Sequence, residues 1–224
     1  KGGGAMSGWW QNTRTIYAIG RNYAAHAAEL SNPVPSKPFW FLKPASALLP
    51  SGGEHRCFPG RTESHHEVEL GVVIGVPARR VTPEHALEHV AGYCLALDMT
   101  DRAGQNDAKK EGKPWTQCKG WDTSCPVSDI IAASQVPDPS KLSLWLRVNG
   151  EAEPRQSGPT SNMIFSVPQL IAALSQVHTL QVGDIILTGT PEGVGAVRPG
   201  DVITAGIQEL GLEVKTTVVE ADSE

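Results

Sequence analysis

Strand-like apolar runs outnumber helical segments along this chain, and the two kinds of segment do not alternate regularly. Both a doubly wound sheet and a TIM barrel require such alternation, so the order of segments predicts a β-rich α+β fold instead. Ser166 precedes the last expected helix and is a good helix-capping residue. Strands are expected at 15–19, 39–42, 67–75, 90–97, 142–149, 184–188, 201–207 and 212–219, and helices at 22–30, 83–88, 101–111 and 167–176.

The 224 residues contain no internal repeat and no low-complexity linker, so one domain is expected over 6–224. The first five residues, KGGGA, resemble the remnant of an expression tag and are not counted in that domain. The proline-rich segments 32–38 and 50–60 are expected to be loops inside the domain, because strand-like runs resume after each of them.

The formal net charge of −5, from 19 Lys and Arg against 24 Asp and Glu, comes without a basic cluster. Nucleic acid is therefore not an expected partner, and a membrane is not expected either, because no apolar run approaches the length of a membrane span. The cysteines lack CxxC spacing, which favours reduced, partly buried thiols in an intracellular protein; they are Cys57, Cys94, Cys118 and Cys125.

The run HHEVELG contains two glutamates, Glu67 and Glu69, two residues apart within an expected strand. Alternate side chains of a strand point to opposite faces, so both carboxylates share a face while apolar side chains fill the other. Asp98 ends a second apolar strand. Buried carboxylates need a cation, and three of them without His or Cys at metal-ligand spacing favour Mg²⁺ or Mn²⁺ over Zn²⁺. The alternative interpretation is a solvent-exposed strand face.

Histidines occur in two segments near the other candidate residues. His26 and Glu29 are three residues apart, which places them on one face of a helix. A histidine oriented by a carboxylate is a good general base near neutral pH, although an ordinary surface pair has the same spacing. His65 and His66, at the start of the glutamate strand, are expected to be solvated and to lie outside the site.

Two loops complete the candidates. The segment PWTQCKGWDTSCP at 114–126 has few helix formers and is expected to be a loop, in which Lys119 is either an exposed lysine or an anchor for an anionic substrate. The segment LTGTPEGVG at 187–195 is a strand that runs into a glycine-rich turn. It lacks the GK[ST] ending of a phosphate loop, so nucleotide binding is rejected, but its hydroxyls and backbone N–H groups suit a carboxylate.

These motifs together resemble the fumarylacetoacetate hydrolase superfamily, and the resemblance runs from about Ile16 to Ile207. The motifs that carry it, in order, are GRNYxxHxxE, HHEVELGVVIG, ALDMTxR, KGxDTSCPVS, NGE…Q and GDIILTGTPEGVG. The resemblance is closest to the short, single-domain acylpyruvases, which include fumarylpyruvate and acetylpyruvate hydrolases and oxaloacetate decarboxylases. It implies a rolled mixed β-sheet with a few short helices, usually in a homodimer.

The same resemblance implies a role for each candidate residue. It implies that Mg²⁺ or Mn²⁺ is held by Glu67, Glu69 and Asp98. It implies a catalytic set in which a dyad orients and deprotonates water and a lysine lies at the substrate, namely His26, Glu29 and Lys119. The substrate, a small 2-keto acid, is expected to contact Arg21, Arg102, Gln105 and Thr190, the last two at its carboxylate.

The chain departs from the family pattern at one position of this set. Relatives commonly read T-x-R-D-x-Q after the metal aspartate, whereas this chain has Ala103 in place of the second aspartate. Asp101 is expected to point elsewhere on the helix, so the hydrogen bonding of Arg102 is the feature that this change affects. A milder change is Trp121, where phenylalanine is common.

The implied reaction is metal-dependent cleavage of the C–C bond of 3-acylpyruvates to pyruvate and a carboxylic acid. Oxaloacetate decarboxylation is expected at the same site, because both reactions pass through the enolate of pyruvate. Two alternatives remain open: an isomerase or decarboxylase of unsaturated 2-keto diacids, whose members often lack the His–Glu dyad, and a non-catalytic metal-bound scaffold. Eukaryotic relatives are often mitochondrial and bacterial ones cytoplasmic, so the compartment stays open between these two.

Overall fold

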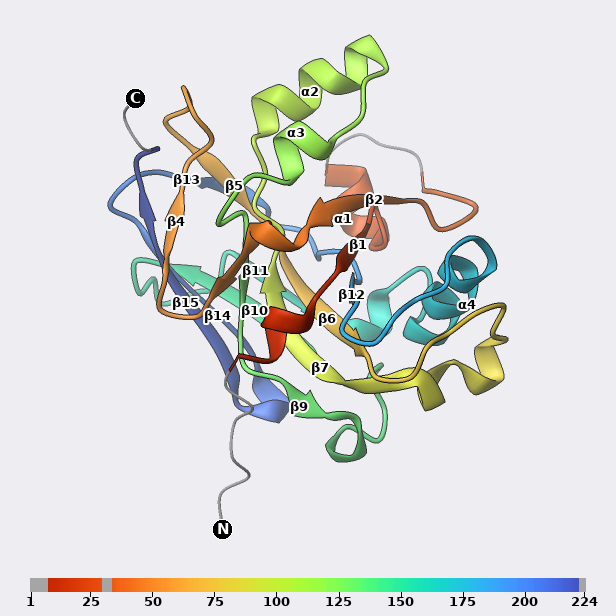
Figure 1. The fold of residues 1–224 in the computed structure, drawn as a ribbon. Helices are drawn as coiled ribbons and strands as arrows, with labels where there is room; N and C mark the ends of the chain where they lie inside the picture. The colour runs from red at the N-terminus through yellow and green to blue at the C-terminus, as the bar shows by residue number, and fades with distance from the viewer. Residues whose placement is uncertain (1–7, 30–33, 222–224) are drawn as a thin grey trace.

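The computed structural model describes residues 8–29 and 34–221. In this part of the chain, β-sheets make up most of the fold and the helices lie around them (Figure 1). The predicted β-rich α+β class with a rolled mixed sheet is confirmed. None of the described helices is long and apolar enough to cross a membrane. The α-helices are α1 (Ala24–Glu29), α2 (Arg102–Glu111), α3 (Thr116–Lys119) and α4 (Val167–Val177). Short 3-10 helices are η1 (Trp9–Asn12), η2 (Ala45–Ala47), η3 (Pro83–His89), η4 (Ala133–Gln135), η5 (Thr160–Asn162) and η6 (Gln208–Leu210).

The larger sheet has the order β2-β1-β12-β6-β7-β8-β3, with β9 paired beside β7. It is mixed, because β1 pairs in parallel with β12 and β3 with β8, while the other neighbours are antiparallel. Its strands are β1 (Thr15–Ile19), β2 (Trp40–Pro44), β3 (Leu48–Pro50), β6 (Val68–Ile74), β7 (Val90–Leu97), β8 (Cys125–Val127), β9 (Ile131–Ala132) and β12 (Ile185–Leu187).

A second sheet has the order β11-β10-β14-β15-β4, and a two-stranded ladder joins β5 to β13. Strands β6 and β7 of the larger sheet contact β10, β14 and β15 of the second one. The strands are β4 (Glu54–Arg56), β5 (Ser64–His66), β10 (Ser143–Val148), β11 (Gln156–Pro159), β13 (Gly195–Val197), β14 (Val202–Ile207) and β15 (Leu212–Val219).

Strand β6 is buried along its whole length, on both faces. Val68 and Leu70 belong to the large core cluster shared with the second sheet. Val73, which lies on the opposite face, packs in a separate cluster with Ile16 and Ile185. A glutamate on either face of this strand is therefore buried, and its charge needs compensation.

The predicted long strands and α-helices are found to within about two residues, and the capping box of Ser166 and Gln169 at α4 is present. Three local predictions are wrong. The segment 83–88 forms a 3-10 helix rather than an α-helix, and 114–126 is not all loop, because it holds α3 and the first strand residues of β8. Strand β4 also lies inside the segment 50–60 that was predicted as loop. Such strands of two to four residues are too short to show alternation, and their pairing comes from distant partners.

The thiols of all four cysteines are free and buried, as predicted. Cys57, Cys94 and Cys125 belong to the core clusters, and Cys118 is a buried residue of α3. Burial raises the pKa of the Cys125 thiol to about 12. These cysteines are therefore packing residues, and none has the lowered pKa of a reactive thiol.

Candidate active site

One cavity of about 30 Å³ gathers the predicted site residues. It lies where β1 and β7 end and β6 begins, and α1, α2 and α3 surround it (Figure 1). Glu29 is the one predicted residue that does not line it; Glu29 lines an adjoining cavity instead. The predicted residues that line the inner cavity are Arg21, His26, Glu67, Glu69, Asp98, Arg102, Gln105, Lys119 and Thr190.

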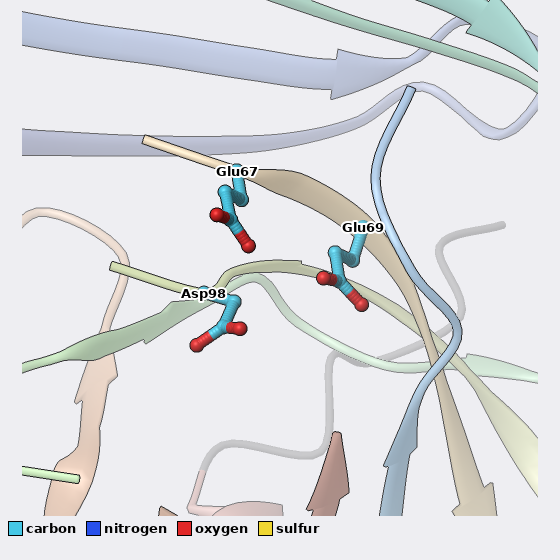
Figure 2. A group of neighbouring side chains, drawn as sticks. All are labelled: Glu67, Glu69 and Asp98. Atoms are coloured by element: carbon cyan, nitrogen blue, oxygen red, sulfur yellow. The ribbon is translucent and has the colours of Figure 1, made fainter. Parts of the chain in front are cut away.

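The pairing of β6 with β7 brings the three predicted carboxylates together. Glu67 precedes β6, Glu69 lies within it and Asp98 follows β7. The antiparallel register continues beyond the strands, because the Asp98 N–H donates to the Glu67 carbonyl at 2.8 Å. One oxygen from each carboxylate lies within 4.8 Å of the others, and all three side chains are buried. Figure 2 shows the three carboxylates gathered side by side, with Glu67 and Glu69 on the same side of their strand.

Buried cations pair with two of these three carboxylates. The ammonium of Lys119 lies 2.8 Å from Glu67 Oε2 and 2.6 Å from Asp98 Oδ2. Lys43 Nζ is 2.7 Å from Asp98 Oδ1, and Arg102 Nη2 donates to Glu67 Oε1. Glu67 and Asp98 are thereby neutralised within the protein.

Glu69 has no ion-pair partner among the described residues and accepts a hydrogen bond from the Gly189 N–H at 2.6 Å. Burial, and then the charges of Asp98 and Glu67, raise the pKa of Glu69 well above its usual range. Burial alone would also raise the pKa of Glu67, but the charges of Lys119 and Arg102 outweigh it and hold that pKa below the usual range. The set therefore contains one carboxylate that lacks a cation.

This donor set fits a hard divalent ion. Its ligand atoms are all carboxylate oxygens within reach of one point, and Mg²⁺ and Mn²⁺ prefer such oxygens. The unpaired Glu69 supplies the negative charge that such an ion would neutralise. The burial of all three side chains contradicts the alternative of a solvent-exposed strand face.

The predicted dyad is formed at the end of α1. Glu29 Oε2 lies 3.3 Å from His26 Nδ1, and Glu29 also accepts a hydrogen bond from the Gly193 N–H at 3.1 Å. A carboxylate that accepts from Nδ1–H leaves Nε2 as the unprotonated nitrogen of His26. Because His26 is buried and lines the inner cavity, that nitrogen is positioned to act as a base there.

Asn22 ties the turn before α1 to the loop that follows β12. Its side-chain amide donates to the carbonyls of Thr188 at 2.8 Å and Phe165 at 2.9 Å, and its Oδ1 accepts from the Phe165 N–H. Arg21, just before it, has a φ of 56°, a left-handed conformation that is uncommon for a residue with a side chain. This turn therefore fixes the position of Arg21 at the cavity.

Helix α2 presents Arg102 and Gln105 to the cavity. Arg102 Nη1 donates to Gln105 Oε1 at 2.7 Å, so Arg102 is anchored by Gln105 and Glu67 without an aspartate at position 103. Asp101 points away, as predicted: it caps α2 by accepting from the Gly104 N–H and pairs with Arg61 at 3.2 Å. Arg102 Nε has no hydrogen-bond partner within the described chain, which leaves a donor for a ligand.

Gln156 is a site residue whose contacts the sequence did not reveal. It is fully buried, and its Nε2 donates to Thr190 Oγ1 at 2.8 Å and to the Pro191 carbonyl at 2.9 Å. Its Oε1 accepts from the Val68 N–H and from His66 Nδ1. Because Thr190 accepts from Gln156, the hydrogen of its own hydroxyl stays free for a ligand.

His66 differs from what the sequence indicated, and Lys43 is a buried residue of the site that was not among the predicted ones. The prediction that His66 is solvated is wrong: it is fully buried, and burial lowers its pKa to about 4. Its neighbour His65 is partly exposed and lines the adjoining cavity. Lys43 is fully buried at the carboxylates. The sequence feature that could have indicated this is a lysine within an otherwise apolar strand, two residues after Phe41, which lines the cavity.

Comparison with known proteins agrees with this geometry. The profile described as "Fumarylacetoacetate (FAA) hydrolase C-terminal" matches residues 15–219. The chain belongs to the fumarylacetoacetate hydrolase family. Members of this family that resemble it over nearly their whole length include the mitochondrial oxaloacetate decarboxylase of Dictyostelium discoideum, 46% identical over 96% of this chain and 98% of that protein.

Two further members of the family are similar to this chain over most of its length. The human mitochondrial oxaloacetate tautomerase FAHD1 is 49% identical over 92% of each chain. The crystal structure of a fumarylpyruvate hydrolase from Pseudomonas aeruginosa, in complex with Mn²⁺ and pyruvate, is 40% identical. It superimposes with a TM-score of 0.86 over 93% of this chain and 90% of that one. The described fold is therefore that of an enzyme of the fumarylacetoacetate hydrolase family.

Proposed function

We propose that this protein is a metal-dependent enzyme that cleaves 3-acylpyruvates to pyruvate and a carboxylic acid and also acts on oxaloacetate. The observation that carries the proposal is the convergence, in one cavity, of the carboxylate cluster with Lys119 and the His26–Glu29 dyad. The relatives named for oxaloacetate and for fumarylpyruvate support the same substrate class, a short 2-keto acid with a second carbonyl group.

The metal ligands in this proposal are Glu67, Glu69 and Asp98. Mg²⁺ or Mn²⁺ bound there supplies a Lewis acid for the oxygens of the α-keto acid. The Mn²⁺ in the fumarylpyruvate hydrolase structure supports this assignment. Thr190 and Gln105 face the same cavity and supply polar groups for the carboxylate of the substrate.

In the proposed hydrolysis, each of three side chains has a separate role. His26 Nε2 accepts a proton from water, while Glu29 holds the ring and stabilises the imidazolium that forms. The hydroxide so formed attacks the distal carbonyl carbon, and the C–C bond then breaks with its electrons passing to the pyruvate fragment as an enolate. The ammonium of Lys119 lies beside that developing charge, and a proton returned from His26 completes pyruvate.

The reactions of oxaloacetate use part of the same machinery. Loss of CO₂ leaves the same enolate and needs no attacking water. Keto–enol tautomerisation moves a proton between the C3 carbon and the C2 oxygen and breaks no C–C bond. Both reactions need Lys119 and the groups that bind the carboxylate of the substrate. One site therefore serves hydrolysis, decarboxylation and tautomerisation. The intact dyad supports hydrolysis over an isomerase or a non-catalytic scaffold.

We also propose a homodimer and a mitochondrial location. The edge strands β2, β3, β4 and β11 end the two sheets, and Leu42 on β2 is 43% exposed. Edge strands of this kind are commonly covered by a second subunit. The mitochondrial names of the relatives favour that compartment over the cytoplasm.

A substrate panel tests the proposed function. The purified protein, supplied with Mg²⁺ or Mn²⁺, is mixed with acetylpyruvate, fumarylpyruvate or oxaloacetate, and the loss of enol absorbance and the release of pyruvate are followed. We expect pyruvate from at least one acylpyruvate. Release from none of the three substrates would contradict the proposal, and turnover of oxaloacetate alone would restrict it to that acid.

A further inference from the structure

Two cations at the inner cavity lack an ion-pair partner within the described part of the chain. Arg21 and Lys109 both line it, and neither forms an ion pair or a hydrogen bond with a carboxylate among the described residues. The three buried carboxylates are equalled in number by three other cations, Lys43, Lys119 and Arg102, which pair with Glu67 and Asp98. Arg21 and Lys109 are therefore in excess of the charge that the protein itself supplies.

Aromatic rings hold both of these cations in place. The Arg21 guanidinium lies 5.5 Å from the centroid of Phe39, and Lys109 Nζ lies 5.4 Å from that of Trp115. The two rings contact each other edge to face, with centroids 5.9 Å apart. A cation held on an aromatic face keeps its charge available on its other side.

The two cations also act on each other. Burial, and then the charges of Arg102 and Arg21, lower the pKa of Lys109. The last turn of α2 favours a lysine through the helix dipole, but Lys110 lies in the same turn, is exposed and pairs with Asp107. The helix dipole therefore does not explain why Lys109 in particular is turned toward other positive charges.

Lys109 lies at the junction of two cavities. It lines the inner cavity with the carboxylate cluster and also the adjoining cavity of about 320 Å³. Arg102 lines both as well, and His65 and Glu29 line the outer one. The inner cavity is small, so a substrate whose keto-acid end occupies it must extend its other end past Lys109.

We propose that Lys109, assisted by Arg21, binds the distal carboxylate of dianionic 2-oxo acids and so selects them over substrates with a neutral tail. This inference rests on the proposed function, because it places the keto-acid end of the substrate at the carboxylate cluster. Lys109 is a specificity-determining residue in this assignment. Oxaloacetate and fumarylpyruvate are dianions of the selected kind, and acetylpyruvate carries one carboxylate.

Inert acids test the selection without turnover. Calorimetry in the presence of Mg²⁺ compares 2-oxoglutarate with 2-oxovalerate, and 2-oxoadipate with 2-oxohexanoate, since each pair differs in a distal carboxylate against a methyl group. We expect the intact protein to prefer the dianion in at least one pair by about 10- to 100-fold, as for a hydrogen bond to a charged group. Lys109→Met should remove the preference and Lys109→Arg should retain most of it.

Lys110→Met is the matched control, because it removes a charge from the same helical turn outside the cavity. It should keep the preference of the intact protein. Equal affinity within both pairs, no binding of any of the four acids, or an unchanged preference in a folded Lys109→Met protein would each overturn the inference. If Lys109→Met does not fold, Arg21→Met is measured in its place, and an unchanged preference there has the same consequence. Absence of turnover in the substrate panel would reject the proposed function alone, because binding selectivity is measured separately.

Discussion

The carboxylate of Glu29 accepts a hydrogen bond from the backbone N–H of Gly193, 164 residues further along the chain, at 3.1 Å. This contact ties the helix of the dyad to the loop that carries Thr190. Gly193 has a φ of +90°, and a Cβ atom there would lie 2.0 Å from the Arg155 carbonyl oxygen, so the position requires glycine. The proposed general base is thus positioned by the same loop that lines the candidate active-site cavity.

His26→Ala should separate the two chemistries of the site. Hydrolysis of an acylpyruvate should fall by about 10²–10⁴-fold, because the water loses its general base. Oxaloacetate decarboxylation needs no attacking water and should fall far less, whereas Lys119→Ala should damage both. Steady-state kinetics on both substrates check this. Equal losses in His26→Ala with metal affinity unchanged would mean that His26 positions the substrate or protonates the enolate.

Removal of the metal should abolish activity. EDTA should inactivate the protein, and Mg²⁺ or Mn²⁺ should restore it, because the three carboxylates need the ion to hold a keto acid. Glu69→Gln should weaken metal activation by more than the ~10–100-fold typical of outer-shell partners. Glu213→Gln, on an exposed position of β15, is the control. Full activity in a metal-stripped sample would reject the metal site.

The pH dependence of stability in the metal-free protein should reveal the charge on Glu69. Its pKa is raised on folding, so the folded protein binds this proton more tightly than the unfolded chain does. The stabilisation of the folded protein by this proton is complete below the ordinary pKa of a carboxyl group. It is lost as the pH rises through the pKa that Glu69 has in the folded protein. In EDTA, Glu69→Gln should therefore melt above the wild type at high pH, and the difference should shrink on acidification. Thermal melts across pH check this, and a constant difference would contradict it.

Gln156→Leu should destabilise the fold and disturb Thr190. The substitution leaves His66 Nδ1, the Val68 N–H and the Pro191 carbonyl without their partner in a buried place. We expect a loss of about 2–4 kcal/mol in the free energy of unfolding, since each of the three unsatisfied groups costs about 1–3 kcal/mol and burial of the leucine side chain offsets part of the sum. Urea denaturation measures this, with exposed Gln208→Leu as the control. A loss below about 0.5 kcal/mol, the usual surface effect, would show that water replaces the side chain.

The protein should sediment as a homodimer at micromolar concentration. The reason is the set of edge strands that end the two sheets, of which β2 carries the exposed Leu42. Leu42→Lys places a charge on that edge and should weaken association if β2 lies in the interface. Sedimentation velocity gives the mass directly, and a monomer for the wild type would reject the homodimer.

The amino-acid sequence by itself determined the local features of this protein. The alternation in 67–75 is enough to place Glu67 and Glu69 on one face, because side chains of a strand point alternately to its two sides. Helical spacing likewise pairs His26 with Glu29, and the capping box sets the start of α4. Each of these depends on residues a few positions apart, so pattern alone predicts it.

The tertiary structure alone decided which distant groups meet. Asp98 lies opposite Glu67 because β6 pairs with β7 in one register, and Lys43 reaches that site from β2. The burial of Gln156 likewise depends on distant contacts. Strand alternation specifies the face on which a side chain lies but not its partner, and the partner is chosen by the packing of the whole chain. The sequence therefore determined which residues could be predicted at the candidate site, and the fold determined the charges around them.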